Sequence, residues 1–228
     1  MAKRIGIISL LALTLFSFGA RASTIPGLFD TGKGIGVDKQ TDFNYKLTDS
    51  LGNAVYGGYG EAAVGNGGYV GKKGSLLGDS GTSHWLTPTS KRSQSFDPSV
   101  DGVYQWTIDF SLKGYSANTA SFSGRFSADN SAVAYLNGHE IGHAGGYTDW
   151  YTFVADSNLG LFVKGTNELQ FVVTNYHQRA GNPTGLRVEF ADSNVSAVPI
   201  PAAIWLFVSA LSGLLAITRK SSGFLGII

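Results

Sequence analysis

Hydrophobic and polar residues alternate strictly along residues 104–112, which is the clearest pattern in the chain. A period of two places successive side chains on opposite faces of an extended backbone, so this segment is predicted to be a β-strand with one buried face. Shorter segments of the same kind follow at close intervals. The sequence predicts further strands at residues 120–127, 132–136, 150–154, 169–174 and 186–190.

Turn-forming residues separate these segments, and no amphipathic helix of even three turns lies between them. Asparagine, aspartate, glycine and proline favour chain reversal because of their backbone dihedrals. They gather at residues 128–130, 137–138, 164–167 and 181–183. Glycine is also dense among tyrosines between residues 52 and 81, where loops and short hairpins are expected. Many short strands without crossover helices predict an all-β fold, an antiparallel β-sandwich or jelly roll.

The N-terminus has the order of a secretory signal. Lys3 and Arg4 precede an apolar stretch at residues 5–18, and Ala20-Arg21-Ala22 supplies small residues before a cleavage position. The sequence therefore predicts a signal peptide at residues 1–22, its removal by signal peptidase, and export of the rest of the chain.

The C-terminal region consists of a proline-containing motif, an apolar run and a basic pair. Val198-Pro199-Ile200-Pro201-Ala202 comes first, residues 204–217 are almost entirely apolar, and Arg219 and Lys220 follow. The run approaches the about 17 to 25 residues that a helix needs to cross a membrane, and basic residues tend to stay on the cytoplasmic side. The sequence thus predicts a transmembrane helix in the inner membrane, with residues 23–197 outside it.

This order of parts resembles the PEP-CTERM sorting tails of Gram-negative bacteria, in the variant that reads Val-Pro-Leu-Pro-Ala. The resemblance implies cutting by an exosortase-type processing enzyme, after transit through the inner membrane, and delivery to the cell surface or the extracellular matrix. The chain then divides into a signal peptide at 1–22, an ectodomain at 23–197, a sorting signal with its transmembrane helix at 198–220, and a short tail at 221–228. The tail departs from the pattern, because such sequences usually stop soon after their basic residues.

Composition removes several classes of function. The chain has no cysteine, which excludes thiol catalysis and thiolate metal sites and leaves stability to packing. The formal net charge is +1 and the basic residues are scattered, so the sequence lacks the basic stripe that phosphate backbones require. We therefore expect no nucleic-acid partner. The ectodomain has the length of one domain with a sizeable core.

Short motifs spread over the ectodomain give a second resemblance. They are Leu28-Phe29-Asp30-Thr31-Gly32, Ser83-His84-Trp85-Leu86, Ala128-Asp129-Asn130, Leu136-Asn137-Gly138, residues 165–175 and residues 182–189. Together they are similar to ectodomains often found upstream of such sorting tails, which look like galactose-binding-like β-sandwiches. The resemblance implies a fold that often carries sugar-binding modules, although a fold does not by itself decide the ligand.

One motif is typical of an enzyme. Residues 139–149 match H-E-x-x-H-x-x-G-x-x-D, with His139, Glu140, His143 and Asp149 at the specified positions. On a helix, the two imidazoles would bind zinc from one face, Glu140 would activate water, and Asp149 would be a third ligand. This motif is typical of a secreted zinc metalloprotease.

The residues around this motif favour a hairpin instead. Asn137-Gly138 is suited to a type I′ turn, so His139 should begin the returning strand. In that strand His139 and His143 would be about 13 Å apart at the backbone, against about 6 Å on a helix. The glycines at 138, 142, 145 and 146 would each cost a helix about 0.8 to 1 kcal/mol. We therefore predict no catalytic residue and no metal ligand, and keep the zinc metalloprotease as the alternative function.

Two stretches combine aromatic rings with hydrogen-bonding side chains. A sugar site needs both, because a pyranose stacks on a ring while its hydroxyl groups bind polar side chains. Tyr147, Trp150 and Tyr151 belong to the first stretch, and His177 and Arg179 to the second. Both stretches are predicted to lie in loops beside strands, where sandwiches place binding residues. Two alternatives stay open: the tryptophan enters the core, and the second stretch is a solvated loop.

We expect no cofactor, although oxygen donors in loops are compatible with a structural calcium ion. These donors are Asp30, Asp38, Asp42, Asp129 and Asn130. None has EF-hand spacing, and aspartates near turns mostly form or cap the turns, so the sequence selects no calcium ligand. The leading hypothesis is a non-catalytic exported protein, with binding to polysaccharide as a subordinate hypothesis.

Overall fold

The computed structural model describes residues 22–34, 41–49, 54–63, 77, 82–89, 91, 94–198 and 202–221. The chain divides into two units, a β-rich unit spanning Arg21–Val198 and a second unit that contains the C-terminal helix. Residues 1–21 of the predicted signal peptide, Pro199, Ile200 and Pro201 of the predicted sorting motif, and residues 222–228 of the predicted tail lie outside the described residues.

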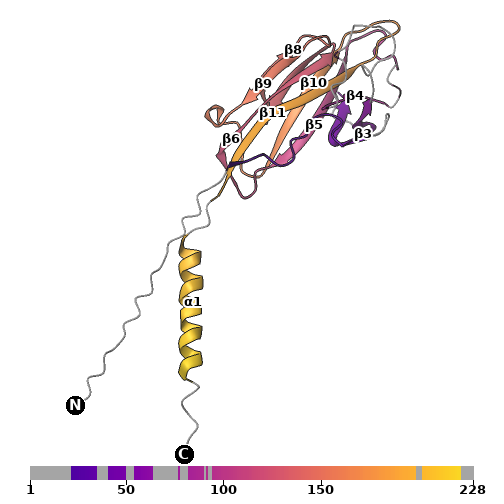
Figure 1. Ribbon diagram of the computed structural model, residues 1–228. Helices are drawn as coiled ribbons and strands as arrows, with labels where there is room; N and C mark the ends of the chain where they lie inside the picture. Colours follow the sequence, from indigo (N-terminus) through magenta and orange to yellow (C-terminus); the bar gives the residue numbers. More distant parts are fainter. Residues whose placement is uncertain are drawn as a thin grey trace, which may run out of the picture. The chain divides into compact units, whose positions relative to one another are not determined.

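The described part of the β-rich unit forms an eleven-stranded sheet in which all pairings are antiparallel (Figure 1). The strands are β1 (Ala22–Ser23), β2 (Thr41–Asp49), β3 (Ala54–Ala63), β4 (Trp85–Thr87), β5 (Gly102–Ser111), β6 (Tyr115–Asp129), β7 (Ser131–Leu136), β8 (His139–Ala144), β9 (Tyr151–Ala155), β10 (Thr166–Asn175) and β11 (Gly185–Ala197). A short 3-10 helix at Ser157–Leu159 follows β9.

The strands form two layers that β3 joins. Hydrogen-bonded neighbours follow the order β8-β7-β10-β5-β2-β3-β4-β11-β6-β9, with β1 beside β11. Because β3 pairs with both β2 and β4, it connects the layer of β5 and β10 to the layer of β6 and β11. Rings from the two layers meet between them, since the centroid of Phe171 in β10 lies 5.4 Å from that of Phe126 in β6. The predicted antiparallel β-sandwich is confirmed.

The core follows from the alternation in the sequence. The apolar face of β5 is buried, including Trp106, Ile108 and Phe110. Phe153 of β9 packs edge-on against Phe122 of β6, with ring centroids 6.0 Å apart. An aromatic pair of this geometry contributes about 0.5 to 1.5 kcal/mol beyond its burial. Aromatic packing between strands that are distant in sequence therefore stabilises the sandwich.

Glycine is required in the middle of β6. A Cβ atom at Gly124 would lie 2.3 Å from the ring of Phe153 and 2.6 Å from the backbone oxygen of Glu189. Both distances are shorter than van der Waals contact, so this residue allows β6 to approach its neighbours while the ring fills the space that a side chain would occupy.

The six strands predicted from alternation are present as β5, β6, β7, β9, β10 and β11, and the predicted returning strand of the hairpin is present as β8. β11 is longer than predicted because two irregularities in register let it stay paired with β6 as far as Ala197. The sequence did not predict β2 and β4, and β3 lies within the glycine-rich region where loops and short hairpins were expected. These strands form through pairing with distant strands, which alternation within a short segment does not reveal.

The second unit contains helix α1, which spans Ala202–Ser221 and includes the basic pair Arg219 and Lys220. Several of its apolar side chains are exposed, including Leu206, Phe207 and Leu214. Within the described residues, no helix combines the length and the hydropathy that a membrane span requires.

Candidate functional site

The zinc-protease motif lies on a strand. β7 ends at Leu136 and β8 begins at His139, and φ is positive at both turn residues, 50° at Asn137 and 83° at Gly138. Positive φ at both central residues is the mark of a type I′ turn, whose twist matches that of the strands it joins. The predicted hairpin is confirmed, and the motif residues that form β8 do not make the helix on which the protease hypothesis depends.

The two motif histidines lie on opposite faces of the sheet. His139 is opposite Leu136 and His143 is opposite Val133. Residues that are opposite each other on paired strands share a face of the sheet. Leu136 and Val133 are three positions apart on β7 and therefore lie on opposite faces, and so do the histidines that pair with them. Glu140 lies near His143, with 3.8 Å between Oε1 and Nδ1, and both side chains are exposed. Two imidazoles separated by a sheet cannot bind one zinc ion at about 2 Å.

The remaining candidate metal ligands have other partners or surroundings. Asp149 is exposed in the loop after β8 and accepts a hydrogen bond of 2.9 Å from the neighbouring threonine hydroxyl. Asp42 and Asp30, considered for calcium, each accept a backbone N–H at 2.7 Å. Asp38 lies outside the described residues. In the described part of the chain, no three His, Cys, Asp or Glu side chains converge as a metal site would need.

Trp150 covers charged side chains on the outer face of the β6–β11 pair. The guanidinium carbons of Arg125 and Arg187 lie 4.4 and 4.9 Å from the centroid of the Trp150 ring. These distances allow cation–π attraction. The indole is half-buried. The alternative in which Trp150 enters the apolar core is therefore wrong, because the side chain packs against guanidinium groups instead.

Glu189 is the centre of this ionic network. Its Oε2 accepts hydrogen bonds from Nε and Nη2 of Arg125, and its Oε1 accepts from Ser83 Oγ at 2.8 Å and from Arg187 Nη2 at 3.3 Å. Arg187 is fully buried and also donates to Ser83 Oγ at 2.7 Å and to the carbonyl oxygen of Leu77 at 3.3 Å. A buried guanidinium needs such partners to offset the cost of removing its charge from water, so the network holds the segments around it together.

Tyr147 and Tyr151 are half-buried on either side of the tryptophan. The carbonyl oxygen of Tyr147 accepts a hydrogen bond from the N–H of Leu77, and that of Gly146 accepts from the N–H of Ala128, both at 3.1 Å. Tyr151 is the first residue of β9 and pairs with β6. The loop between β8 and β9 is thus attached to β6 at both ends.

His177 forms a surface pair with Asp101. Its backbone N–H and its Nδ1 lie 2.8 and 2.7 Å from the same carboxylate oxygen. The hydrogen bond from the backbone and then that from the imidazole lower the pKa of Asp101 below its usual value. The two side chains remain 61% and 47% exposed, so both can reach a ligand. Arg179 is exposed in the same loop.

The loop after β10 is ordered by neighbouring turns. The N–H of Tyr176 donates to Asn130 Oδ1 at 2.7 Å, and the N–H of Gln178 donates to the carbonyl oxygen of Asp97 at 3.1 Å. Asn182 closes the loop, because its Nδ2 donates to the carbonyl oxygen of Tyr176 at 3.0 Å. The loop is solvated, as the alternative interpretation of the second stretch predicted, but its backbone is attached to two other segments.

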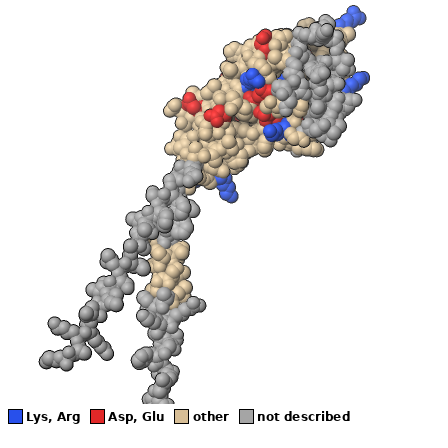
Figure 2. Space-filling view, viewed as in Figure 1, with Lys and Arg blue, Asp and Glu red and all other residues tan. Residues whose placement is uncertain are grey.

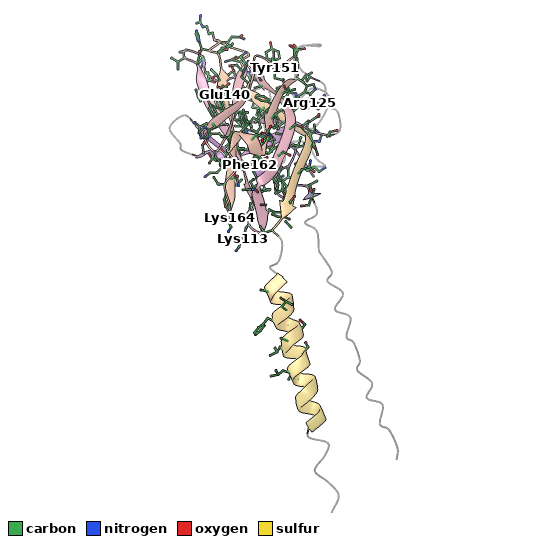
Figure 3. The ribbon with its side chains drawn as sticks, turned by 90° about the vertical axis from the view of Figure 1, so that its left-hand side faces the viewer. Lys113, Arg125, Glu140, Tyr151, Phe162 and Lys164 are labelled. Carbon is green, nitrogen blue, oxygen red and sulfur yellow. The ribbon has the colours of Figure 1, made fainter. Side chains whose placement is uncertain are left out.

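Both predicted stretches lie at the same end of the sandwich. β5 begins there, while β6, β8 and β10 end there, because neighbouring strands are antiparallel. We call it the turn end, and it consists of the turns at 97–101, 129–131, 145–150 and 176–182. Tyr151 lies at this end, whereas Lys113 and Lys164 lie at the opposite one (Figure 3). Four turns that are separate in the sequence are thus brought to one region.

Asp129 is a buried carboxyl group within the turn end. It is 8% exposed, and the loss of water around it raises its pKa to about 7. Nearby in the fold, Asn175 ends β10, and its Nδ2 donates to Asp97 at 2.6 Å while its buried Oδ1 has no hydrogen-bond partner. Buried polar groups of this kind are uncommon in folded proteins, and perturbed carboxyl groups often occur at functional sites.

Sequence reasoning missed several polar residues of this region. Arg187 and Glu189 stand at alternate positions of an apolar strand, which places both on one face. That pattern alone also fits an exposed face. Their burial depends on Trp150 and on Leu77, which are distant in sequence. Asp101 was missed because a carboxylate before a strand is ordinarily a turn residue.

No protein-family model and no curated protein matches the chain. Three solved structures that match part of it are a β-glucosidase from Kluyveromyces marxianus in complex with glucose, a family 35 carbohydrate binding module from an environmental isolate, and a PA14 sugar-binding domain from an RTX adhesin. Their identities are 12%, 17% and 12%, over 60%, 68% and 71% of this chain, with TM-scores of 0.31, 0.27 and 0.28. The match spans 98% of the second and third chains but 19% of the glucosidase. Likenesses this distant assign no ligand, and the fold rests on the strand pairing described above.

Proposed function

We propose that this chain is an exported, non-catalytic protein whose β-sandwich binds carbohydrate at the turn end. The observation that carries the proposal is that residues 147–151 and 176–179 lie at one end, on loops attached by hydrogen bonds to the strands beside them. A sugar site needs aromatic and hydrogen-bonding groups that are held in place before the ligand arrives, because preorganisation reduces the entropy cost of binding.

The exposed groups at this end suit sugar hydroxyls. The ring of Tyr176 is 52% exposed and offers an apolar face to a pyranose. Asp101 is held as a carboxylate by His177 and accepts hydrogen bonds, whereas Arg179 donates them. Figure 2 shows acidic and basic side chains next to each other on one face of the molecule, and Asp101 and Arg179 give the turn end both signs of charge as well. Mixed charge favours a neutral or weakly charged glycan over a polyanion.

A glycan array with the purified full chain tests this proposal. We expect the wild-type chain to bind at least one class of glycan, and His177→Ala to lose that binding, because the substitution also removes the partner of Asp101. Glu140→Gln is the matched control, since it changes an exposed polar side chain on β8, outside the turn end. An array on which no glycan retains the wild-type chain, or retains His177→Ala equally well, contradicts the proposal.

The two termini support a proposal about destination. The order of charges, apolar runs and small residues fits a signal peptide at 1–22 and a sorting signal at 198–220, which signal peptidase and an exosortase-type enzyme would process in turn. The protein would pass through the inner membrane and reach the cell surface or the extracellular matrix, where polysaccharide is the partner we propose.

Mass spectrometry of the protein recovered from membranes and from the medium tests this destination. We expect a mature N-terminus near Ser23 and, in the released form, a C-terminus near Pro199. A released protein that still ends at Ile228, or still begins at Met1, would contradict the proposed processing.

A further inference from the structure

A concave site lies where β2 separates from β5. The two strands pair over four residues, ending at Lys46 opposite Thr107. Beyond that point, the segment around Gly27 lies beside Asp109 instead. The separation leaves an open pocket of about 330 Å³. This volume falls in the range of about 300 to 1,000 Å³ that is usual for small-ligand sites.

Two phenylalanine rings form the apolar part of this pocket. Phe43 is 77% exposed and Phe29 is 40% exposed, and both line the opening. A single exposed ring on a protein surface is unremarkable, but two rings that share a concave site with polar groups form the kind of surface that binds an amphipathic ligand.

The walls of the pocket are held in place by buried hydrogen bonds. Asp42 is buried, and its two carboxylate oxygens accept the N–H of Gly32 at 2.7 Å and the N–H of Asn44 at 2.8 Å. The hydroxyl group of Tyr45 donates to the carbonyl oxygen of Phe29 at 2.7 Å. These bonds attach the segment that carries Phe29 to the strand that carries the second ring. The backbone segments that carry the two rings are therefore held in place relative to each other.

Gly27 allows the segment to pass close to β5. Its φ is 93°, and a Cβ atom there would lie 3.2 Å from Phe110 Cβ and 3.4 Å from the carbonyl oxygen of Asp109. An L-residue is strained at this φ, so glycine permits both the turn and the close approach. Gly27 therefore lets this side of the pocket lie directly against β5.

Besides Gly27 and Ile108, four polar residues line the pocket: Asn44, Lys46, Thr107 and Asp109. They provide an amide, an ammonium, a hydroxyl and a carboxylate, so donors and acceptors are both present and the formal charges cancel. This lining matches a neutral ligand that carries hydroxyl groups and presents an apolar face. We infer that this Phe43 pocket is a second carbohydrate subsite, which takes one neutral hexopyranose unit stacked on Phe43.

The Phe43 pocket is separate from the turn end. Asp109 lies seven residues along β5 from Gly102, which begins the strand at the turn end. At about 3.3 Å per residue this is about 23 Å. The pocket stands on its own contacts, so its function and that of the turn end can fail independently.

Saturation-transfer NMR on the full chain tests the pocket, with the methyl glycosides of glucose, galactose and mannose as probes. We expect Phe43→Ala to weaken binding of at least one probe about tenfold, and Phe43→Trp, which keeps an aromatic face, to retain it. A urea denaturation curve of each variant beside that of the wild-type chain shows whether the substituted protein keeps its fold, so that lost binding is not read from an unfolded sample. Asp109→Asn serves as the second variant, since it removes a hydrogen-bonding charge without changing side-chain size.

The outcomes separate the two sites. Loss of binding in Phe43→Ala and Asp109→Asn, with a component that survives in His177→Ala, supports the pocket. Binding that His177→Ala abolishes and both pocket variants leave intact overturns the pocket while the turn end stands. Binding that only the pocket variants abolish supports the pocket and contradicts the turn end. A wild-type chain that binds none of the three probes overturns the pocket as a hexopyranose site.

Discussion

Glu189 is the residue on which the charge balance of the β6–β11 face depends. It binds both Arg125 and the fully buried Arg187. Exposed ion pairs contribute about 0 to 1 kcal/mol, whereas removing one partner of a buried pair is costly because the other charge is left without compensation. The same carboxylate also orders Trp150 indirectly, since both guanidinium groups lie under that ring.

We expect Glu189→Gln to lower the free energy of unfolding by about 3 to 5 kcal/mol, because a neutral amide removes the carboxylate charge that pairs with the buried Arg187. Urea denaturation of the full chain at constant pH measures this. Glu140→Gln removes a carboxylate from an exposed pair and should cost less than about 1 kcal/mol. If the two substitutions cost the same, the network does not stabilise the fold as described.

Asp129 should make stability depend on pH. Burial raises its pKa to about 7, so the folded chain binds this proton more tightly than the unfolded chain. Stability from this group is full below about pH 4 and is lost as pH rises toward 7. We expect Asp129→Asn to remove that loss and to stabilise the protein at pH 8, by at most about 4 kcal/mol for a shift of about three pKa units. Urea midpoints at pH 5 and pH 8 measure the difference, and an unchanged pH dependence in the variant would contradict it.

At this scale the sequence identified the kinds of residue better than their surroundings. It singled out Trp150, His177 and Arg179 as site candidates, and the fold brings their loops to one end. It did not reveal that Trp150 lies over two arginines. Burial of a charged side chain results from covering residues that are distant along the chain, and local alternation contains no information about them.

Among the elements, the β7–β8 hairpin depends most on a single turn. Asn137 adopts a φ of 50°, its Nδ2 donates to the carbonyl oxygen of Leu161 at 2.8 Å and to Asn167 Oδ1 at 2.9 Å, and its Oδ1 accepts the N–H of Glu168 at 2.9 Å. The turn therefore connects β8 to the start of β10 as well as to β7. The turn could be predicted from the sequence because Asn137 and Gly138 are adjacent. The contacts with β10 could not, because they join residues that are distant along the chain.

We expect Asn137→Ala to cost about 2 to 4 kcal/mol, from the lost hydrogen bonds and from an alanine at positive φ. Asn137→Gly should cost about 1 kcal/mol less, because glycine adopts this φ without strain. Urea denaturation of both variants separates the two contributions. Equal losses would mean that the backbone conformation contributes nothing, and no loss in either would mean that the side chain is not anchored.

For the whole molecule, the sequence predicted the fold class because alternating strands and turn residues act within short segments. β5 and the hairpin show this most clearly. The joining of the two layers was not predictable, since it depends on β3 pairing with β2 on one side and β4 on the other. The Phe43 pocket was missed for the same reason: it exists only where β2 parts from β5 and the segment around Gly27 fills the edge.

Two subsites on one domain would make binding to a polymer stronger than binding to a single sugar. When a polysaccharide occupies the first site, its effective concentration at the second site is high. The loss of either site therefore weakens polymer binding more than it weakens monosaccharide binding. We expect Phe43→Ala and His177→Ala each to reduce retention on an immobilised polysaccharide by a larger factor than on the free methyl glycosides. Surface plasmon resonance with both ligand forms measures the two factors. Equal factors would mean that the sites do not engage one polymer together, because their separation or orientation prevents it.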